Sequence, residues 1–470
     1  MTLIKSISGI RGTIGGTVGD NLTPQDIVEC TAAFGSWILE KSGIPQVVLG
    51  RDARISGDIV NNLVVNTMRM MGINVIDLGL ATTPTVEMAV PGLGAGAGIV
   101  ITASHNPKQW NALKFLNHAG EFISASDGAD ILSRIGTDKI NYSNVDKLGT
   151  YELNDNWLER HINAIFALEY VDLDLVRERQ FKVVVDAINS VGGVAVPVLL
   201  GKMGCEVIVL NGECDGKFAH NPEPLPEHLS DLSKSVLSNR ADIGIAVDPD
   251  VDRLALVCED GEMFGEEYTL VAVADFILSQ RPGNTVSNLS STRALRDITL
   301  RRGGKYTAAA VGEVNVVEKM KATNAIIGGE GNGGIILPEL HYGRDALVGI
   351  AIMLTSLARF GKPLSFLRAT FPNYFISKNK IELSPELDMD AILPAVKAHY
   401  TNSYQKDLDS GKVTINTEDG LKIDFENDWV HLRKSNTEPI IRIYAESNSD
   451  VTANTLVKKI KSDIQLIVKK

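Results

Sequence analysis

The chain has 470 residues, 44% hydrophobic and 22% charged, and its formal net charge at pH 7 is −12. This length is sufficient for three or four domains, and the composition is that of a globular protein, which excludes disordered and fibrous classes. No stretch approaches the ~18 uninterrupted apolar residues of a membrane span. The acidic balance argues against nucleic acid as the main partner.

The N-terminal sequence and the cysteines indicate the compartment. The first residues lack a positive region followed by an apolar run, so we predict no signal peptide. The four cysteines are scattered and too few for a disulfide framework, which favours a reducing, cytoplasmic environment. An acidic protein that binds anions must concentrate its positive charge locally, in a cleft.

The first block, residues 1–150, alternates strand-like and helix-like segments. We expect strands over 46–50 and 74–78, a helix over about 58–71 between them, and an apolar strand over 98–102. Continuous apolar strands that alternate with helices predict a mostly parallel sheet that is covered on both faces.

The pattern restarts after a polar stretch near residues 141–150 and gives two further α/β blocks, 151–256 and 257–370. We expect strands at 182–187, 206–210, 243–247, 254–257, 285–289 and 325–327. Helices are expected at 193–203, 268–280, 294–301 and 345–360.

The last block, residues 371–470, reads as a smaller α+β domain. Strands are expected at 412–416, 421–425, 429–432 and 440–446, with turn residues after the first two, and a helix at 453–468. The fold prediction is therefore three successive α/β domains with mostly parallel mixed sheets, followed by a C-terminal α+β domain.

The segment Thr102-Ala103-Ser104-His105-Asn106-Pro107 is the strongest local signal in the first block. It lies where a buried strand ends, which is where open α/β sheets present functional groups. His105 could move a proton beside Ser104, and Lys114 supplies a positive charge. A turn with a capping serine would also explain the segment.

Asp248-Pro249-Asp250-Val251-Asp252-Arg253 follows the strand expected at 243–247. Three carboxylates at alternate positions repel one another unless a hard divalent cation, most simply Mg²⁺, gathers them, and Arg253 suits a site that also holds phosphate. A calcium loop would place arginine where it needs glycine. A solvated acidic turn is the remaining alternative.

Three further segments are weaker signals. Arg433–Pro439, with Arg442 downstream, offers cations, hydroxyls and an amide suited to a phosphate. Ser8–Thr13 carries Arg11 between glycines, and Gly329–Gly334 carries Glu330 and Asn332, which could bind sugar hydroxyls. Each of the three segments could also be a simple turn.

Together and in this order, the motifs resemble the α-D-phosphohexomutase family over essentially the whole chain. The resemblance implies four domains around a central cleft, one Mg²⁺ per chain, and phosphate carried on Ser104. It assigns Ser104, Asp248, Asp250 and Asp252 to the metal. It assigns Arg11, His105, Lys114 and Arg253 to the surroundings of the serine, Glu330 to the sugar, and Arg433, Ser435, Asn436 and Thr437 to the phosphate that does not react.

The resemblance also implies the reaction, which interconverts hexose 6-phosphate and hexose 1-phosphate through a sugar bisphosphate. Two loops depart from the common family pattern. Asn332 and Gly334 replace serine and histidine in the sugar loop, and Asn436 replaces glycine in the phosphate loop. The Glu-x-Asn-Gly-Gly form resembles archaeal-like members, which favours phosphoglucosamine mutase activity over the alternative, phosphomannomutase/phosphoglucomutase.

Two functions of other classes remain as alternatives. An Mg²⁺-dependent sugar phosphatase would use the same carboxylates without Ser104, and a non-catalytic protein would only bind a sugar phosphate. We expect a small phosphosugar as the partner, with neither nucleic acid nor membrane, and a monomer or homodimer.

Overall fold

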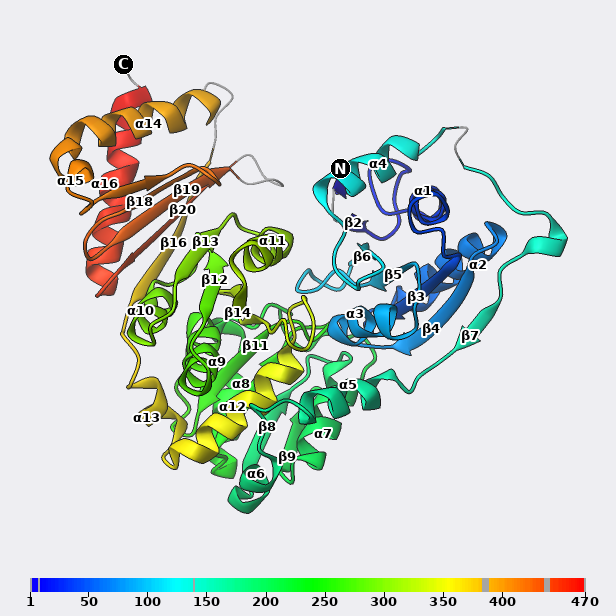
Figure 1. Ribbon diagram of the computed structural model, residues 1–470, viewed down its shortest axis with the longest axis horizontal. Coiled ribbons are helices and arrows are strands. Elements are labelled where there is room, and N and C mark those ends of the chain that lie inside the picture. The colour runs from blue at the N-terminus through cyan, green and yellow to red at the C-terminus, as the bar shows by residue number, and fades with distance from the viewer. Residues whose placement is uncertain (1, 7–8, 138–139, 383–388, 435–439, 469–470) are drawn as a thin grey trace. The chain divides into compact units, whose positions relative to one another are not determined.

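The computed structural model describes residues 2–6, 9–137, 140–382, 389–434 and 440–468. Strands and helices alternate along most of the chain, as expected for the α/β class (Figure 1). Two compact units are present, one of Met1–Arg281 with Ile326–Arg368 and the other of Pro282–Ala325 with Ala369–Lys470. Within the described ranges, no helix is both long and apolar enough to cross a membrane. The domain boundaries after residues 150, 256 and 370 stay predictions.

Seven strands form the first sheet of unit 1. Their spatial order is β1 (Ile4–Ser6), β2 (Gly9–Thr13), β6 (Trp110–Leu116), β5 (Ala97–Ile101), β3 (Gln46–Arg51), β4 (Asn74–Leu80) and β7 (Tyr151–Leu153). The neighbouring pairs β1–β2, β2–β6 and β6–β5 are antiparallel. The pairs β5–β3, β3–β4 and β4–β7 are parallel. The sheet is therefore mixed. Its antiparallel part is formed by β1, β2 and β6, three strands that we did not predict from the sequence.

Helices cover both faces of this sheet. Because successive side chains of a strand point to opposite faces, Val47 and Leu49 of β3 face one layer and Val48 faces the other. The first layer consists of α1 (Pro24–Trp37), α2 (Gly57–Met70) and α4 (Ala125–Arg134). The second consists of α3 (Thr83–Gly92) and the start of α5 (Trp157–Phe166). Burial on both faces explains the uninterrupted apolar run of β5.

The second sheet of unit 1 has four strands in the order β11 (Leu254–Cys258), β10 (Ile243–Val247), β8 (Lys182–Asp186) and β9 (Glu206–Leu210). The β11–β10 pair is antiparallel and the other two are parallel. Helices α6 (Leu173–Arg179), α7 (Gly192–Lys202) and α8 (Ser230–Asn239) accompany these strands. Strand β10 is buried throughout and has the predicted bounds, so the aspartate segment starts at its carboxyl end.

The rest of unit 1 contains α9 (Glu266–Gln280), the hairpin β14 (Ala325–Glu330) and β15 (Gly334–Ile336), α12 (Ala346–Phe360) and α13 (Leu364–Arg368). Our expectation that a glycine-rich loop follows a strand ending at Ile327 was wrong, since β14 continues to Glu330 and pairs with β15. Gly329 permits this because a Cβ there would lie 2.0 Å from the carbonyl oxygen of Gly334.

Unit 2 contains the parallel pair β12 (Asn284–Asn288) and β13 (Tyr306–Ala309), with α10 (Ala294–Arg301) and α11 (Glu313–Thr323). It also contains a wholly antiparallel sheet in the order β16 (Phe375–Glu382), β20 (Ile440–Ser447), β19 (Trp429–Lys434), β18 (Leu421–Asp424) and β17 (Thr414–Asn416). Helices α14 (Met389–Ser403), α15 (Gln405–Asp409) and α16 (Asp450–Val468) accompany it. The predicted terminal helix packs Ile460 and Ile464 into this core.

Candidate active site

Ser104 lies in the connection between β5 and β6, two residues beyond Thr102. Its φ of 47° is in the left-handed region, which non-glycine residues rarely adopt and which often marks functional positions. The backbone N–H of Ser104 donates to Thr102 Oγ1 at 2.9 Å, and that hydroxyl donates to Asp52 Oδ2 at 2.7 Å. The serine is therefore held by side chains anchored at the ends of two neighbouring strands.

Arg54 holds the same loop through its backbone. Its Nη1 donates to the carbonyls of Pro107 (2.8 Å) and Trp110 (2.9 Å), and its Nη2 donates to those of Ser104 (2.5 Å) and Asn106 (2.6 Å). Its Nε donates to Asp52 Oδ2 at 3.0 Å, and both side chains of this ion pair are fully buried. One guanidinium thus fixes four carbonyls of the serine loop.

The aspartate segment forms a tight loop after β10. Asp248 Oδ1 accepts hydrogen bonds from the backbone N–H groups of Asp252 and Arg253, both at 3.1 Å. Val251 has a φ of 61°, which is a marked outlier for a β-branched residue. The side chains of Asp248, Asp250 and Asp252 are all buried. Strain and burial concentrated between three carboxylates indicate a functional loop.

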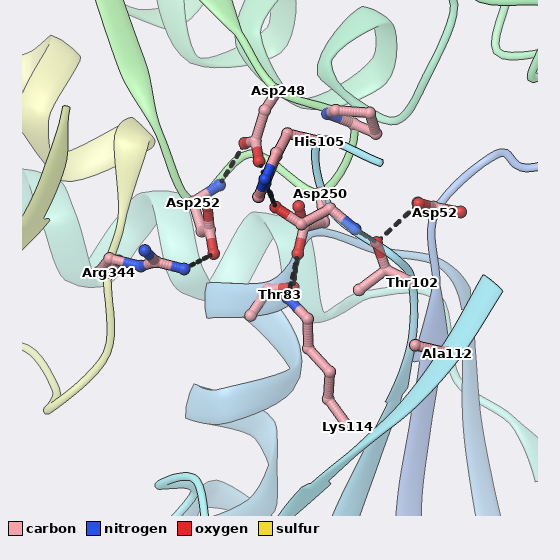
Figure 2. A network of polar contacts seen from close by, with 12 residues as sticks. Asp52, Thr83, Thr102, His105, Ala112, Lys114, Asp248, Asp250, Asp252 and Arg344 are labelled. Atoms are coloured by element: carbon pink, nitrogen blue, oxygen red, sulfur yellow. Dashed lines mark hydrogen bonds and ion pairs between the residues drawn. The ribbon is translucent and has the colours of Figure 1, made fainter. Parts of the chain in front are cut away.

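Ser104 and the three aspartates converge. The Ser104 hydroxyl donates to Asp248 Oδ2 at 2.8 Å, across 144 residues of sequence. One ligand atom from each of Asp248, Asp250 and Asp252 lies within 4.8 Å of the others, a grouping that could hold a metal ion (Figure 2). Among the described residues, no hydrogen bond reaches the buried Oδ1 atoms of Asp250 and Asp252. Burial, with the nearby Asp252 and Asp250, raises the pKa of Asp248 well above its ordinary value. An all-oxygen donor set with buried, unsatisfied oxygens fits Mg²⁺.

Lys114, on β6, faces this group (Figure 2). Its ammonium donates to Asp250 Oδ2 at 2.9 Å, and the hydroxyl of Thr83 donates to the same oxygen at 2.7 Å. Burial alone would raise the pKa of Asp250, but Lys114 and Thr83 hold it below its ordinary value. Asp250 is therefore ionised beside a cation.

His105 and Arg253 lie at the edge of the site. The Nδ1 atom of His105 is 3.4 Å from the Ser104 hydroxyl oxygen. Burial and the charges of Arg253 and Arg344 lower the pKa of His105 to about 2, so its ring is neutral in this arrangement. Arg253 contacts Glu223 at 3.6 Å and Asp252 at 3.8 Å. Both predicted residues thus adjoin the serine and the aspartates.

Arg344 connects the aspartates to Glu330. It donates to Asp252 Oδ2 at 2.6 Å and to Glu330 Oε2 at 2.8 Å, and the bond to Asp252 is visible in Figure 2. Asn332 lies in the turn between β14 and β15, where its Oδ1 accepts the N–H of Gly334 at 3.2 Å. Glu330 therefore belongs to the same group of contacts as the aspartates, whereas Asn332 closes the hairpin turn.

The register of β2 against β6 shows on which face of the sheet Arg11 lies. In the β2–β6 pair, Arg11 is opposite Ala112 and Gly9 is opposite Lys114. Residues two apart on a strand share a face, so Arg11 and Lys114 project from the same face of the sheet. Burial lowers the pKa of Arg11 below its ordinary value.

The remaining predicted site residues belong to unit 2. Arg433 on β19 is directly opposite Arg442 on β20, and Arg433 Nη1 lies 3.4 Å from Asp419 Oδ2. The predicted residues Ser435, Asn436 and Thr437 lie outside the described residues. Two arginines on paired strands, one before and one after this segment of the chain, are consistent with anion binding.

Four contributors to the site were missed from the sequence: Asp52, Arg54, Thr83 and Arg344. Arg54 had a local signal, because Arg51-Asp52-Ala53-Arg54 follows a predicted strand at its carboxyl end. Arg344 precedes Asp345, the predicted first residue of a helix and the observed N-cap of α12. Thr83 gave no local signal, because its partner Asp250 is 167 residues away.

Four sequence profiles match successive parts of the chain, and all describe phosphoglucomutase/phosphomannomutase. Alpha/beta/alpha domain I matches residues 3–141, domain II residues 159–261, domain III residues 265–374, and the C-terminal domain residues 386–462. The chain belongs to this family. It is therefore a phosphohexomutase, an isomerase, and the family and enzyme class predicted from the sequence are confirmed.

Similar proteins cover nearly the whole chain. A Methanopyrus kandleri protein named "Probable phosphoglucosamine mutase" is 34% identical over 451 residues, covering 96% of this chain and 95% of the relative. A Thermococcus kodakarensis protein named "Phosphoglucomutase/phosphomannomutase" is also 34% identical, covering 94% and 95%. The crystal structure of a phosphoglucomutase/phosphomannomutase family protein from Burkholderia thailandensis has a TM-score of 0.83 at 27% identity, covering 99% and 97%. These matches confirm the predicted fold class.

Proposed function

We propose that this phosphohexomutase interconverts glucosamine 6-phosphate and glucosamine 1-phosphate, with Ser104 as the carrier of the transferred phosphoryl group. The observation that carries the proposal is the contact between the Ser104 hydroxyl and Asp248, within a buried group of three aspartates. A phosphatase or a binding protein would not require a strained serine at this position.

The proposed chemistry proceeds in two transfers. The bond between Ser104 Oγ and phosphorus breaks as a sugar hydroxyl forms a bond to that phosphorus, which yields a bisphosphate. The hydroxyl proton passes to a nearby base and from there to the departing Ser104 Oγ. His105 Nδ1 is a candidate for this base, because it adjoins Ser104 Oγ and a neighbouring phosphoryl charge raises an imidazole pKa. After the bisphosphate turns over, its other phosphoryl group returns to Ser104 Oγ.

The surrounding side chains would position and neutralise the reacting group, as phosphoryl transfer requires. Asp248, Asp250 and Asp252, together with a phosphoserine oxygen, would hold one Mg²⁺, which supplies electrostatic stabilisation of phosphoryl oxygens. Lys114 stays protonated, since Asp250 and Asp252 raise its pKa against the effect of burial. Glu330 is our candidate for the sugar hydroxyls, and Arg433, Arg442 and their loop stay the candidate for a second phosphate.

The proposed preference for glucosamine phosphates rests on the names of two relatives and on the sequence of the loop that follows Glu330. The Methanopyrus kandleri relative and one from Sulfurisphaera tokodaii, which is 30% identical over 462 residues, have names that include phosphoglucosamine mutase. The loop Glu330-Gly331-Asn332-Gly333-Gly334 has the Glu-x-Asn-Gly-Gly form that favours phosphoglucosamine mutase activity. Glucose and mannose phosphates are the alternative substrates, as the name of the Thermococcus kodakarensis relative indicates.

A coupled mutase assay tests the proposal. Glucosamine, glucose and mannose phosphates would be compared with Mg²⁺ and a trace of the matching bisphosphate, for wild type and Ser104→Ala. We expect the highest kcat/KM with glucosamine phosphate and a loss of at least ~10³-fold in Ser104→Ala. Ser126→Ala is the control. Because Ser126 is an exposed serine, this variant should retain full activity. Equal activity of wild type and Ser104→Ala, or release of inorganic phosphate alone, would contradict the proposal.

A further inference from the structure

The aspartate loop is held from outside by the N-termini of two helices. At the start of α3, the N–H of Thr83 donates to the Asp250 carbonyl at 2.9 Å while its hydroxyl donates to the Asp250 carboxylate. At the start of α12, the N–H of Ala346 donates to the Val251 carbonyl at 3.2 Å. Arg344, two residues earlier, donates to Asp252. Any shift of one helix start relative to the other would therefore move the carboxylates.

A buried side-chain network joins these two helix starts. Asp345 is the N-cap of α12, and its Oδ1 accepts the N–H groups of Leu347 and Val348. Its Oδ2 lies 2.9 Å from His161 Nε2 and 3.4 Å from His341 Nε2. Two imidazoles therefore extend from one capping carboxylate.

Each imidazole reaches α3 with its other nitrogen. His161 Nδ1 lies 3.0 Å from the hydroxyl of Thr85, which lies 2.7 Å from the hydroxyl of Thr82, the N-cap of α3. His341 Nδ1 lies 3.3 Å from Glu87 Oε2, one turn further along α3. The network thus connects the N-cap of α12 to the N-cap of α3 through His161 and to Glu87, within α3, through His341.

The segment from His341 to Asp345 is fitted closely to Glu87. A Cβ at Gly343 would lie 1.8 Å from Glu87 Oε2, so the backbone passes too near the carboxylate for any side chain. Both ends of this segment, His341 and Asp345, are anchored in the network, and Arg344 extends from between them to Asp252. The network therefore fixes the point from which Arg344 reaches the aspartate loop.

We propose that Thr85, Glu87, His161, His341 and Asp345 form a positioning network that sets the affinity of the aspartate loop for its divalent cation. The inference rests on the proposed function, because that function assigns Mg²⁺ to the loop. The charges are consistent with a rigid link: although burial lowers the pKa of His341, Asp345 and Glu87 raise it to about 10. An imidazolium between two buried carboxylates holds both of them.

The test measures Mg²⁺ binding directly, by isothermal titration calorimetry of the full chain at neutral pH. The variants are His341→Gln and Glu87→Gln, each of which removes one charge of the network without touching the aspartates. Arg134→Gln is the matched control, because Arg134 is a buried arginine of the same unit that pairs with Asp130 and Glu40 on another face. Thermal denaturation of each protein gives its stability separately.

We expect one Mg²⁺ per wild-type chain and a roughly 10-fold weaker Kd in each network variant, in line with residues that orient metal ligands. Arg134→Gln should lower the melting temperature and leave the Kd unchanged. If wild type binds Mg²⁺ and the network variants bind it equally well, the network inference is wrong while the proposed function stands. An equal loss of affinity in Arg134→Gln would also overturn the inference. Absence of Mg²⁺ binding to wild type would instead contradict the metal site of the proposed function. If His341→Gln does not fold, Glu87→Gln decides.

Discussion

Arg344 shares its charge between the aspartate loop and Glu330, the sugar-contact candidate. It bonds to Asp252 and Glu330, and the side chains of both carboxylates are almost fully buried. Arg344→Gln would leave two buried carboxylates without this cation, a change that typically costs roughly 3–5 kcal/mol. We therefore predict a clear fall in the free energy of unfolding, measured by urea denaturation in the presence of a chelator.

Added Mg²⁺ should recover part of this loss in Arg344→Gln, because the cation would compensate Asp252. Wild type under the same two conditions is the reference. If Arg344→Gln unfolds at the same urea concentration as wild type, Arg344 does not compensate these carboxylates.

The ionisation of His341 makes the free energy of unfolding depend on pH, and the sign of this dependence follows from its raised pKa. It faces Glu87 of α3, Asp345 at the start of α12 and His161 of α5. Its pKa is raised from the ordinary 6.5 to about 10, so its stabilising contribution is complete below about pH 6.5 and is lost as the pH rises through about 10. The difference in free energy of unfolding between wild type and His341→Gln should therefore shrink over that pH range. Denaturation curves across the range check this, and a difference that stays constant or grows would refute the assignment.

At the scale of elements, the serine loop between β5 and β6 depends on Arg54. Lysine at this position keeps a charge beside Asp52 but cannot supply the planar set of donors that reaches four carbonyls. We predict that Arg54→Lys lowers kcat by about 10²-fold with a smaller effect on KM, because Ser104 is misplaced while the sugar contacts remain.

Hydrogen exchange of the backbone amides between β5 and β6 provides the second measurement on Arg54→Lys. Faster exchange confined to this loop is the expected result. Unchanged exchange and unchanged kcat would show that Arg54 is not what holds the serine.

The sequence was most informative where a motif directly follows a buried strand. Strand β10 was predicted with its observed bounds, and the aspartates follow it directly. The N-terminal β1 and β2 were not predicted, because short strands with little apolar alternation give no periodic signal. Helix α1 did carry a signal that was overlooked, a capping box of Thr23 and Asp26 with proline at the first helical position.

The parts of the site that were missed depend on tertiary contacts. Arg344 and Asp252 are 92 residues apart, and His161 and Asp345 are 184 apart. No local spacing brings such residues together, so only the folded chain reveals that His161, His341 and Glu87 lie behind the aspartate loop. Sequence motifs therefore predicted the candidate reacting groups, and the structure shows which residues contact them.

At the scale of the whole molecule, the chain is acidic, and we expected its positive charge to gather where anions bind. Around Ser104, the carboxylates Asp248, Asp250, Asp252 and Glu330 outnumber the cations Lys114, Arg253 and Arg344 by one. Binding of one divalent cation would make this group of charges net positive. Recognition of a phosphosugar by such an acidic protein is thus consistent with a metal-dependent site.

The most direct test of the central claim is whether Ser104 carries the phosphoryl group. The full chain would be incubated with Mg²⁺ and glucosamine 1,6-bisphosphate and examined by intact-protein and peptide mass spectrometry. We predict one added phosphoryl group, located on Ser104, that is replaced by a heavy phosphoryl group when glucosamine 6-phosphate carrying ¹⁸O in its phosphate is added, and that Ser104→Ala never gains. Isomerisation by a wild-type chain that never acquires phosphate on Ser104 would contradict the account.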